Sequence, residues 1–178
     1  FNQLPPSRQS KEAPQMIKNI FGKTGENVWV EAPFHCDYGW NIEVGENFYS
    51  NYNLTILDVG KVTCGKNVQI APNVSIYTAG HPVHPDSRNS GYEYGIPVTV
   101  GDNVWIGGNT VILPGVTVGS NVVIGAGSVV SKDIPDNTIV AGNPCKVIRE
   151  ITDEDRIYYF KKQKFDDEAW EEVKNKNK

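Results

Sequence analysis

An aliphatic residue recurs at every sixth position through the middle of the chain. Six consecutive hexads run from Val100 to Pro135, and they begin at Val100, Ile106, Ile112, Val118, Ile124 and Val130. Three earlier hexads and a weaker fourth begin at Val44, Cys64, Ile70 and Thr24. Sandwiches of hairpins have turns roughly every 8–12 residues and no fixed period. The strict period therefore indicates a stack of similar structural units.

The fourth position of each hexad carries a residue type that tolerates a left-handed backbone. Reading from the hexad at Val44 onward, these positions hold Asn47, Asn67, Asn73, Asn103, Asn109, Gly115, Asn121, Gly127 and Asp133. Gly, Asn and Asp adopt positive φ most readily. The second position is nearly always Gly, Ala or Ser, which suits a tight corner. The pattern predicts a short strand and a sharp turn in every hexad, with three hexads in each turn of a triangular coil over residues 24–145.

Composition and charge narrow the possible functions. The 178 residues include 21 Val and 15 Ile but only 4 Leu, with 17 Asn and 17 Gly, which favours an all-β chain with many turns. A net charge of −4 and a pI near 5.4 argue against a general binder of nucleic acid or of membrane surfaces. No apolar run approaches the ~20 residues of a membrane span.

The cysteines and the first residues indicate a compartment. Cys36, Cys64 and Cys145 are odd in number and lack the spacing of a zinc site, so we expect free thiols in a reducing environment. The first fifteen residues contain no apolar stretch of the kind found in signal peptides. We expect a cytoplasmic protein.

The repeat is interrupted in three places, and polar residues gather there. The longest interruption, residues 77–97, is rich in Pro, Gly and polar residues and contains His81 and His84. A long loop inside a compact array is commonly functional. The interruptions at 30–43 and 50–63 hold Asp37, Tyr38, Trp40, Asn51, Asn53 and Asp58. If all three face the same side of the coil, they form one pocket.

The segments that flank the repeat have helical character. Before it, the sequence predicts a loop and a short helix with an apolar stripe of Met16, Ile17, Ile20 and Phe21. After it, residues 146–178 form an extension that we expect to be partly helical. Asp166 or Asp167 is expected to cap the last helix.

From about Pro6 to Phe165 the chain resembles the galactoside and maltose O-acetyltransferases, which are hexapeptide-repeat acyltransferases. The motifs that carry the resemblance are NFYSNYNLTILDVG, IAPNVSIYTAGHPVHP, RNSGYEYGIPVTVGDNVWIGG, PGVTVG, VIGAGSVVSKDIPDN and AGNPCKVIREI. The resemblance implies a left-handed parallel β-helix and a homotrimer with active sites between subunits. It also implies that residues 1–23 are the remnant of a helical N-terminal cap. The implied reaction moves an acetyl group from acetyl-CoA to a sugar hydroxyl.

The same resemblance implies the catalytic groups. A neutral hydroxyl is a weak nucleophile toward a thioester, so a base must remove its proton during the attack, and histidine is suited to this at neutral pH. The matching position is His81, whereas we expect His84 to be structural. Asn51 matches a residue that contacts the acceptor and steadies the transition state. Gly108 matches the position that stabilises the oxyanion and offers a backbone N–H.

The resemblance also implies the binding residues. Acceptor contacts are expected at Asp37, Tyr49, Asn51, Asp58 and Glu93. A groove of small residues with cations at its end suits CoA, and its contacts are expected at Ala71, Trp105, Gly108, Ala126, Ser131, Lys132, Lys146 and Arg149. Asp37 and Val59 stand where galactoside-type relatives have Ser and an acidic residue. The acceptor therefore stays open among maltose, glucose, a galactoside and a cell-envelope sugar.

Two other functions are compatible with a coil of hexads. A γ-type carbonic anhydrase-like enzyme would need three histidine ligands, so His35, His81 and His84 would all have to converge. A non-catalytic trimeric scaffold or sugar-binding protein would not need His81 or the CoA-type residues. We expect the acetyltransferase, with acetyl-CoA as co-substrate, no metal, and no nucleic-acid or membrane partner.

Overall fold

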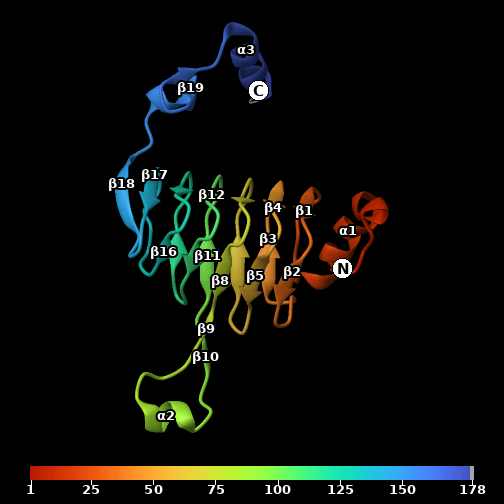
Figure 1. Ribbon diagram of the computed structural model, residues 1–178, viewed down its shortest axis with the longest axis vertical. Helices are drawn as coiled ribbons and strands as arrows, with labels where there is room; N and C mark the ends of the chain where they lie inside the picture. The colour runs from red at the N-terminus through yellow and green to blue at the C-terminus, as the bar shows by residue number, and fades with distance from the viewer. Residues whose placement is uncertain (177–178) are drawn as a thin grey trace.

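The computed structural model describes residues 1–176, and their centre is a parallel β-solenoid of about six turns with short terminal helices. The predicted fold class is confirmed. The coil has three faces, which we name sheets A, B and C, and each face is a ladder of short strands that are parallel except at the C-terminal end of sheet B (Figure 1). The chain passes from sheet A to sheet B to sheet C in every full turn.

The strands are two to five residues long. Sheet A contains β3 (Ile42–Val44), β6 (Val62–Cys64), β11 (Val98–Val100) and β14 (Thr117–Val118). Sheet B contains β1 (Val28–Val30), β4 (Phe48–Ser50), β7 (Gln69–Ile70), β12 (Trp105–Ile106), β15 (Val123–Ile124), β17 (Thr138–Ala141) and β18 (Lys146–Glu150). Sheet C contains β2 (Phe34–Cys36), β5 (Leu54–Leu57), β8 (Ser75–Tyr77), β13 (Val111–Ile112) and β16 (Val129–Val130).

The first residue of each hexad points into the coil and stacks on its equivalents in the neighbouring turns. In sheet B, Ile106 pairs in register with Ile70 on one side and with Ile124 on the other, and Val140 follows. All four side chains are buried. Because β-branched side chains fit a pleated surface and contribute about 1.5–3 kcal/mol each when buried, this column explains why Val and Ile replace Leu.

The fourth hexad position adopts the left-handed backbone, as the sequence predicts. Positive φ is found at all six asparagines of that set and at both of its glycines. At the corner from sheet A to sheet B the asparagine side chains form a continuous amide ladder, with N···O distances of 2.8–2.9 Å, through Asn27, Asn47, Asn67, Asn103, Asn121 and Asn137. Asp133 was predicted wrongly. It is absent from the residues with positive φ, and its carboxylate instead accepts the N–H of Thr117 at 2.8 Å.

Residues 77–97 form an ordered projection. Strands β9 (Ala79–Gly80) and β10 (Tyr94–Gly95) pair antiparallel, and the short helix α2 (Pro85–Asn89) closes the tip. Figure 1 shows this hairpin standing away from the coil. His84 has the structural role expected of it, because its Nδ1 accepts the N–H of Asp86 at 3.2 Å and so caps α2.

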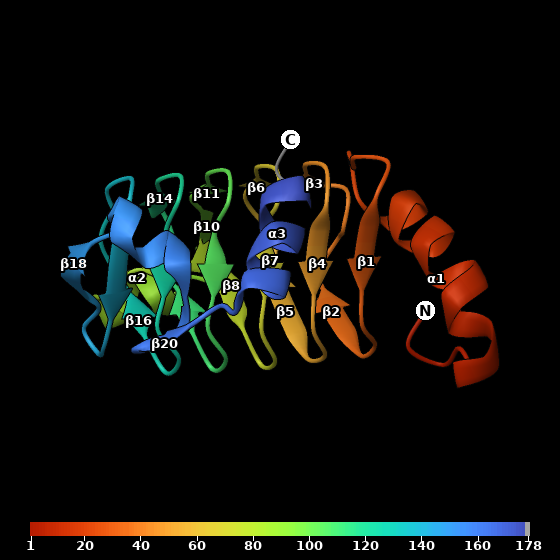
Figure 2. The same ribbon diagram turned by 90° about the horizontal axis from the view of Figure 1, so that it is seen from above.

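The N-terminal helix α1 (Pro6–Ile20) covers the first turn of the coil (Figure 2) and is longer than the short helix predicted. Ile17 and Phe21 of the predicted stripe are buried, while Met16 and Ile20 are half-buried. Pro at the start of a helix costs no hydrogen bond, so the two prolines at positions 5 and 6 allow the helix to begin early. No helix among residues 1–176 has the length and apolar character that crossing a bilayer requires.

The C-terminal part first completes the coil and then leaves it. Strand β18, which begins the predicted extension, pairs antiparallel with β17 and so belongs to sheet B. Residues 151–176 follow as an arm made of η1 (Asp153–Ile157), β19 (Tyr158–Phe160), β20 (Gln163–Lys164) and α3 (Asp167–Lys176). The arm passes above sheet B, on the side of the coil opposite the hairpin (Figures 1 and 2). Asp166 caps α3, as predicted, by accepting the N–H of Ala169 at 2.9 Å.

Candidate functional site

The predicted site residues lie on two different edges of the prism. The hairpin edge, between sheets C and A, consists of the turns 37–41, 58–61 and 131–133 and the loop 78–97. It carries six of the predicted residues: Asp37, Asp58, His81, Glu93, Ser131 and Lys132. The small-residue edge, between sheets B and C, consists of the turns 51–53, 71–74, 107–110 and 125–128. Together with sheet B it carries Tyr49, Asn51, Ala71, Trp105, Gly108, Ala126, Lys146 and Arg149.

Sheet C separates the two edges within one chain. Strand β5 connects Asn53 on the small-residue edge to Asp58 on the hairpin edge. Five residue steps of about 3.3 Å each place these two positions roughly 16 Å apart. The condition for one pocket, that the three interruptions face the same side of the coil, is therefore not met within one chain, because Asn51 and Asn53 lie on the other edge from Asp37 and His81.

On the hairpin edge, the Asp58 carboxylate holds the preceding turn in place. The side chain is fully buried. Its Oδ1 accepts the N–H groups of Asp37 and Tyr38, both at 3.0 Å, and its Oδ2 accepts that of Gly39 at 2.8 Å. Gly39 is itself buried at φ +84°, a conformation that costs other residues energy. Since its oxygens are engaged by backbone, Asp58 supports the turn, and an acceptor would meet Asp37 instead.

The base of the hairpin is fixed to the same edge. The hydroxyl of Thr78 donates to the carbonyl of Leu57 at 2.6 Å and accepts the N–H of Gly60 at 2.7 Å. The carbonyl of Thr78 accepts the N–H of Ile96 at 2.8 Å. The first strand of the hairpin is therefore bonded to the chain on both sides of Asp58, and the second strand is bonded to the first through Thr78. These bonds give His81 a defined position relative to Asp37.

His81 is arranged as a base would need to be. Its Nδ1 lies 3.0 Å from the carbonyl oxygen of Tyr92. A carbonyl can only accept, so this contact assigns the hydrogen of the neutral ring to Nδ1 and leaves Nε2 with a free lone pair. Nε2 lies 3.9 Å from Oε1 of Glu93, and the side chain is 53% exposed. The imidazole can therefore take a proton at Nε2 with a carboxylate beside it.

Carboxylates accumulate around this position. The pKa of Asp37 is raised by partial burial, by Asp58 and by Glu93. The pKa of the Cys36 thiol is raised to about 11 by burial, by Asp58 and by Asp37. Burial is the largest cause of both shifts, and the neighbouring carboxylates add to it. Carboxylate oxygens at this place can accept hydrogen bonds from the hydroxyl groups of an acceptor.

The small-residue edge brings together the small residues that were expected to line the CoA site. Ala71, Gly107 and Ala126 occupy successive corners, and a Cβ at Gly107 would meet the backbone N of Ala126 at 2.5 Å. The N–H groups of Gly107 and Asn109 donate to Ile124 and Pro72. No backbone carbonyl in residues 1–176 accepts the N–H of Gly108, so this donor is available to an oxyanion.

The outer surface of sheet B continues from this edge. Tyr49, Gln69, Trp105, Val123, Ile139 and Arg149 pair in register along one row. Trp105 is 55% exposed and offers a flat apolar wall. The row therefore brings Trp105, which was predicted to contact CoA, onto the same face as Tyr49, which was predicted to contact the acceptor.

The predicted cations are not gathered at one point. Lys132 lies on the hairpin edge, whereas Lys146 and Arg149 lie on β18. Arg149 forms a bidentate ion pair with Asp155, at 2.7 and 2.6 Å. This pair raises the pKa of Arg149, and Arg149, together with the Thr152 N–H, holds the pKa of Asp155 well below its usual range. The ion pair fixes the arm to β18, so Arg149 would have to exchange a partner in order to bind a phosphate.

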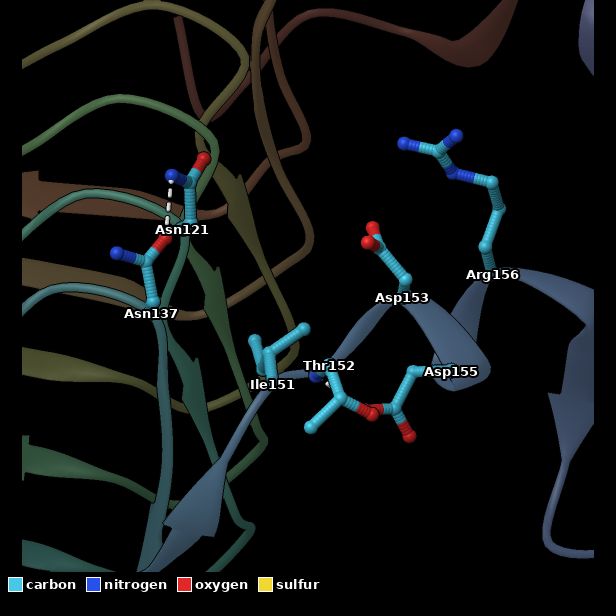
Figure 3. A pocket seen from close by; sticks show the side chains of 7 residues that line it. All are labelled: Asn121, Asn137, Ile151, Thr152, Asp153, Asp155 and Arg156. Carbon is cyan, nitrogen blue, oxygen red and sulfur yellow. Dashed lines mark hydrogen bonds between the residues drawn. The ribbon is translucent and has the colours of Figure 1, made fainter.

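A hollow of about 680 Å³ lies between the coil and the arm (Figure 3). Its walls are Asn121, Asn137, Ile151, Thr152, Asp153, Asp155 and Arg156. None of the predicted contact residues is among them, and Asp153 and Asp155 would repel the phosphates of CoA. The hollow is a consequence of the arm passing above the coil, and we do not place the substrate there.

The positions of the three histidines do not favour the γ-type carbonic anhydrase-like alternative. His35 lies in β2, His81 at the base of the hairpin and His84 at its tip. Within residues 1–176, no three His, Cys, Asp or Glu side chains come together in a way that could hold a metal ion.

Two aromatic residues of the interruption at 30–43, Tyr38 and Trp40, also lie on the hairpin edge. Tyr38 and Trp40 stack with their ring centroids 5.0 Å apart and remain largely exposed. The signal was present in the sequence as two aromatic residues in an interruption of the repeat. It could not be interpreted before the turn was known to face the same edge as His81.

The chain is similar in sequence to known acetyltransferases. Residues 97–132 match the family model for bacterial transferase hexapeptide (six repeats). The galactoside O-acetyltransferase of Escherichia coli (strain K12) is 55% identical over 164 residues, which are 92% of this chain and 80% of that protein.

Two solved structures are similar to the whole coil. A galactoside acetyltransferase in complex with coenzyme A has a TM-score of 0.90 and 55% identity, covering 93% of this chain and 82% of the other. A maltose O-acetyltransferase from Clostridium difficile 630 has a TM-score of 0.83 and 54% identity, covering 86% of this chain and 81% of the other.

A solenoid of hexads that carries a histidine on an inserted hairpin defines a class, the hexapeptide-repeat acyltransferases. Within that class, the chain belongs to the galactoside and maltose O-acetyltransferase family, and the predicted family and enzyme class are confirmed.

Proposed function

We propose that this protein transfers the acetyl group of acetyl-CoA to a hydroxyl of a neutral sugar, with His81 as the general base, in sites shared between the subunits of a homotrimer. The observation that carries the proposal is the His81 imidazole. Its Nδ1 is held by the carbonyl of Tyr92, and its Nε2 is left open beside Glu93. The relatives named as galactoside and maltose O-acetyltransferases support the substrate class. The coenzyme A bound to one of them supports the donor.

In the proposed reaction, Nε2 of His81 takes the hydroxyl proton as the sugar oxygen attacks the thioester carbonyl. The developing oxyanion is stabilised by the unused N–H of Gly108, and Asn51 lies on the same edge two turns of the coil away. The carbon–sulfur bond then breaks, and the thiolate leaves with the proton that His81 had taken. No covalent enzyme intermediate is needed. Asp37 and Glu93 accept hydrogen bonds from the remaining hydroxyls and orient the sugar.

The separation of the two edges supports a site between subunits. One chain places His81 and Asn51 on opposite sides of sheet C, so a single coil cannot bring both to one acceptor. Cyclic packing of three prisms brings the hairpin edge of one copy against the small-residue edge of the next. The arm supports the same assembly, because residues 151–176 include no buried side chain although Ile157, Tyr159 and Phe160 are apolar and exposed.

The cysteines and the expected CoA contacts are compatible with the same proposal. The three cysteines are free thiols, as in proteins of a reducing cytoplasm. The CoA contacts expected at Ser131 and Lys132 lie on the hairpin edge and would be supplied by the neighbouring subunit. Those expected at Trp105, Ala126 and Lys146 come from sheet B and its edge.

The function itself is tested by following free thiol released from acetyl-CoA in the presence of a panel of sugars. We expect release with neutral sugars such as maltose, glucose or a galactoside, and a product that is heavier by one acetyl group. Addition of a zinc chelator should leave the rate unchanged. A protein that binds the sugars but releases no thiol with any of them would be a binding module, and the proposal would be wrong.

The shared site is tested by mixing two inactive variants. His81→Ala and Asn51→Ala chains, co-refolded in equal amounts, should form trimers in which about a quarter of the interfaces combine an intact His81 with an intact Asn51. We expect about that fraction of wild-type activity to return. A mixture of either variant with the double variant is the control and should stay inactive. If the first mixture also stays inactive although mixed trimers form, the two residues do not share a site across the interface.

A further inference from the structure

Two large aromatic side chains on the hairpin edge contact each other and remain exposed to solvent. Tyr38 is 48% exposed and Trp40 is 65% exposed. Their ring centroids are 5.0 Å apart, with an angle of 35° between the planes. Paired aromatic rings expose a broad apolar surface, and such a surface on a soluble protein commonly marks a binding site.

The turn that bears the rings is held rigidly. The Asp58 carboxylate accepts the N–H groups of residues 37–39, and the side-chain amide of Asn41 donates to the carbonyl of Asp58 at 2.7 Å. At Gly39 a Cβ would lie 2.8 Å from the carbonyl oxygen of Ile20, so the backbone also packs closely on helix α1. A ligand that meets the rings meets a surface ordered in advance, which lowers the entropy cost of binding.

The rings lie along the same edge as the proposed base. Asp37 directly precedes Tyr38, and Glu93 is among the charges that raise the pKa of Asp37. Glu93 in turn lies 3.9 Å from Nε2 of His81. The edge therefore carries an aromatic surface, two carboxylates that can accept hydrogen bonds, and the proposed base.

We propose that Tyr38 and Trp40 form an acceptor subsite that binds the apolar C–H face of a pyranose ring, while Asp37 accepts a hydrogen bond from one of its hydroxyls. A pyranose has hydroxyls around its rim and C–H groups on its faces. The negative face of an aromatic ring attracts those C–H groups. A pocket with an apolar surface and a few directed polar groups fixes both the position and the orientation of such a ligand. This inference rests on the proposed function, and it adds residues that select the acceptor.

The experiment compares Trp40→Ala and Trp40→Phe with Phe160→Ala, a matched control on the arm where the ring is similarly exposed. For Trp40→Ala we expect the KM for the sugar to rise about tenfold, the equivalent of roughly 1.4 kcal/mol, while the KM for acetyl-CoA and the unfolding midpoint stay near wild type. Trp40→Phe should keep most of the sugar affinity because it retains a ring. Phe160→Ala removes a ring from the arm, which is assigned to the subunit contact, so it should not raise the KM for the sugar relative to the KM for acetyl-CoA.

A second readout does not depend on catalysis. Sugar added without acetyl-CoA should change the tryptophan fluorescence of the wild type, and the change should disappear in Trp40→Phe although Trp29, Trp105 and Trp170 remain. If it persists in Trp40→Phe, or if Trp40→Ala has the wild-type KM for sugar, the subsite is wrong while the acetyltransferase stands. If Trp40→Ala instead dissociates into monomers in sedimentation, the rings form a subunit contact and the subsite is wrong. Loss of the fluorescence change in Trp40→Phe, in a protein that transfers no acetyl group, would support the subsite and refute the proposed function.

Discussion

Replacing His81 with alanine is expected to lower kcat by about 10²–10⁴-fold, the usual contribution of a general base. In this variant the sugar hydroxyl would lose its proton to water, since within residues 1–176 no second imidazole stands at the base of the hairpin. His81 is half-exposed on a projection that leaves the coil. Trimer formation, the unfolding midpoint and the KM for acetyl-CoA should therefore stay near wild type. Steady-state rates of thiol release measure the effect.

His84→Ala is the matched control for this prediction. The residue lies on the same loop and caps a five-residue helix through Nδ1, so its loss should change kcat by less than about tenfold. A folded His81→Ala protein with near-normal turnover would contradict the mechanism. So would an equally large effect at His84, because the base would then be assigned to the wrong histidine.

Replacing Asp58 with alanine is expected to affect stability and acceptor binding together. The change leaves three backbone N–H groups without their carboxylate, and each buried donor that loses its partner costs about 1–3 kcal/mol. Because Asp37 and Tyr38 are exposed and water can replace part of the loss, we expect a total near 3 kcal/mol. In a chain of this length that corresponds to an unfolding midpoint lower by roughly 6–12 °C. The freed turn should also raise the KM for the sugar, while the KM for acetyl-CoA changes little.

Asp102→Ala is the control for this prediction. It separates the loss of the turn that Asp58 holds from the loss of any aspartate that accepts a backbone N–H. Asp102 also accepts a backbone N–H, that of Lys66 at 2.7 Å, but on the exposed corner between sheets A and B. Its loss should cost about 1 kcal/mol or less and leave both KM values unchanged. Thermal unfolding and initial rates, measured on both variants, decide the matter. If Asp58→Ala is as stable as Asp102→Ala and binds sugar normally, the carboxylate does not hold the turn in the way its hydrogen bonds indicate.

The repeat by itself determined the coil. A strand of two or three residues followed by a left-handed corner leaves the chain few alternatives, because each choice is local: an aliphatic residue inward, a small residue at the bend, and Asn or Gly at positive φ. Asp133 is the exception. Its carboxylate accepts the N–H of Thr117 and its backbone does not adopt positive φ, and the residue type alone does not reveal which of the two a chain will adopt.

The site was determined only in part. Motifs in the sequence led to the family and to His81 as the proposed base, because the residues of each motif are contiguous in the chain. Tertiary structure alone decided which residues share an edge. Asn51 and Asp58 are seven positions apart, yet an intervening strand places them on opposite edges, whereas Asp37 and Glu93, far apart in sequence, lie on the same one.

The partners of side chains were likewise decided by packing. The sequence presents Arg149 as a free cation and Asp58 as a contact for the acceptor. In the folded chain Arg149 is paired with Asp155, and Asp58 is enclosed by the turn it supports. Both outcomes depend on the path of the backbone. The arm brings Asp155 to Arg149, and the turn at residues 37–39 folds over the Asp58 carboxylate. The hydrophobic period and the turn residues act over a few positions, so the sequence alone predicts their effect. Ion pairs, and the grouping of residues on one edge of the prism, join different turns of the coil. They exist only once the coil has formed.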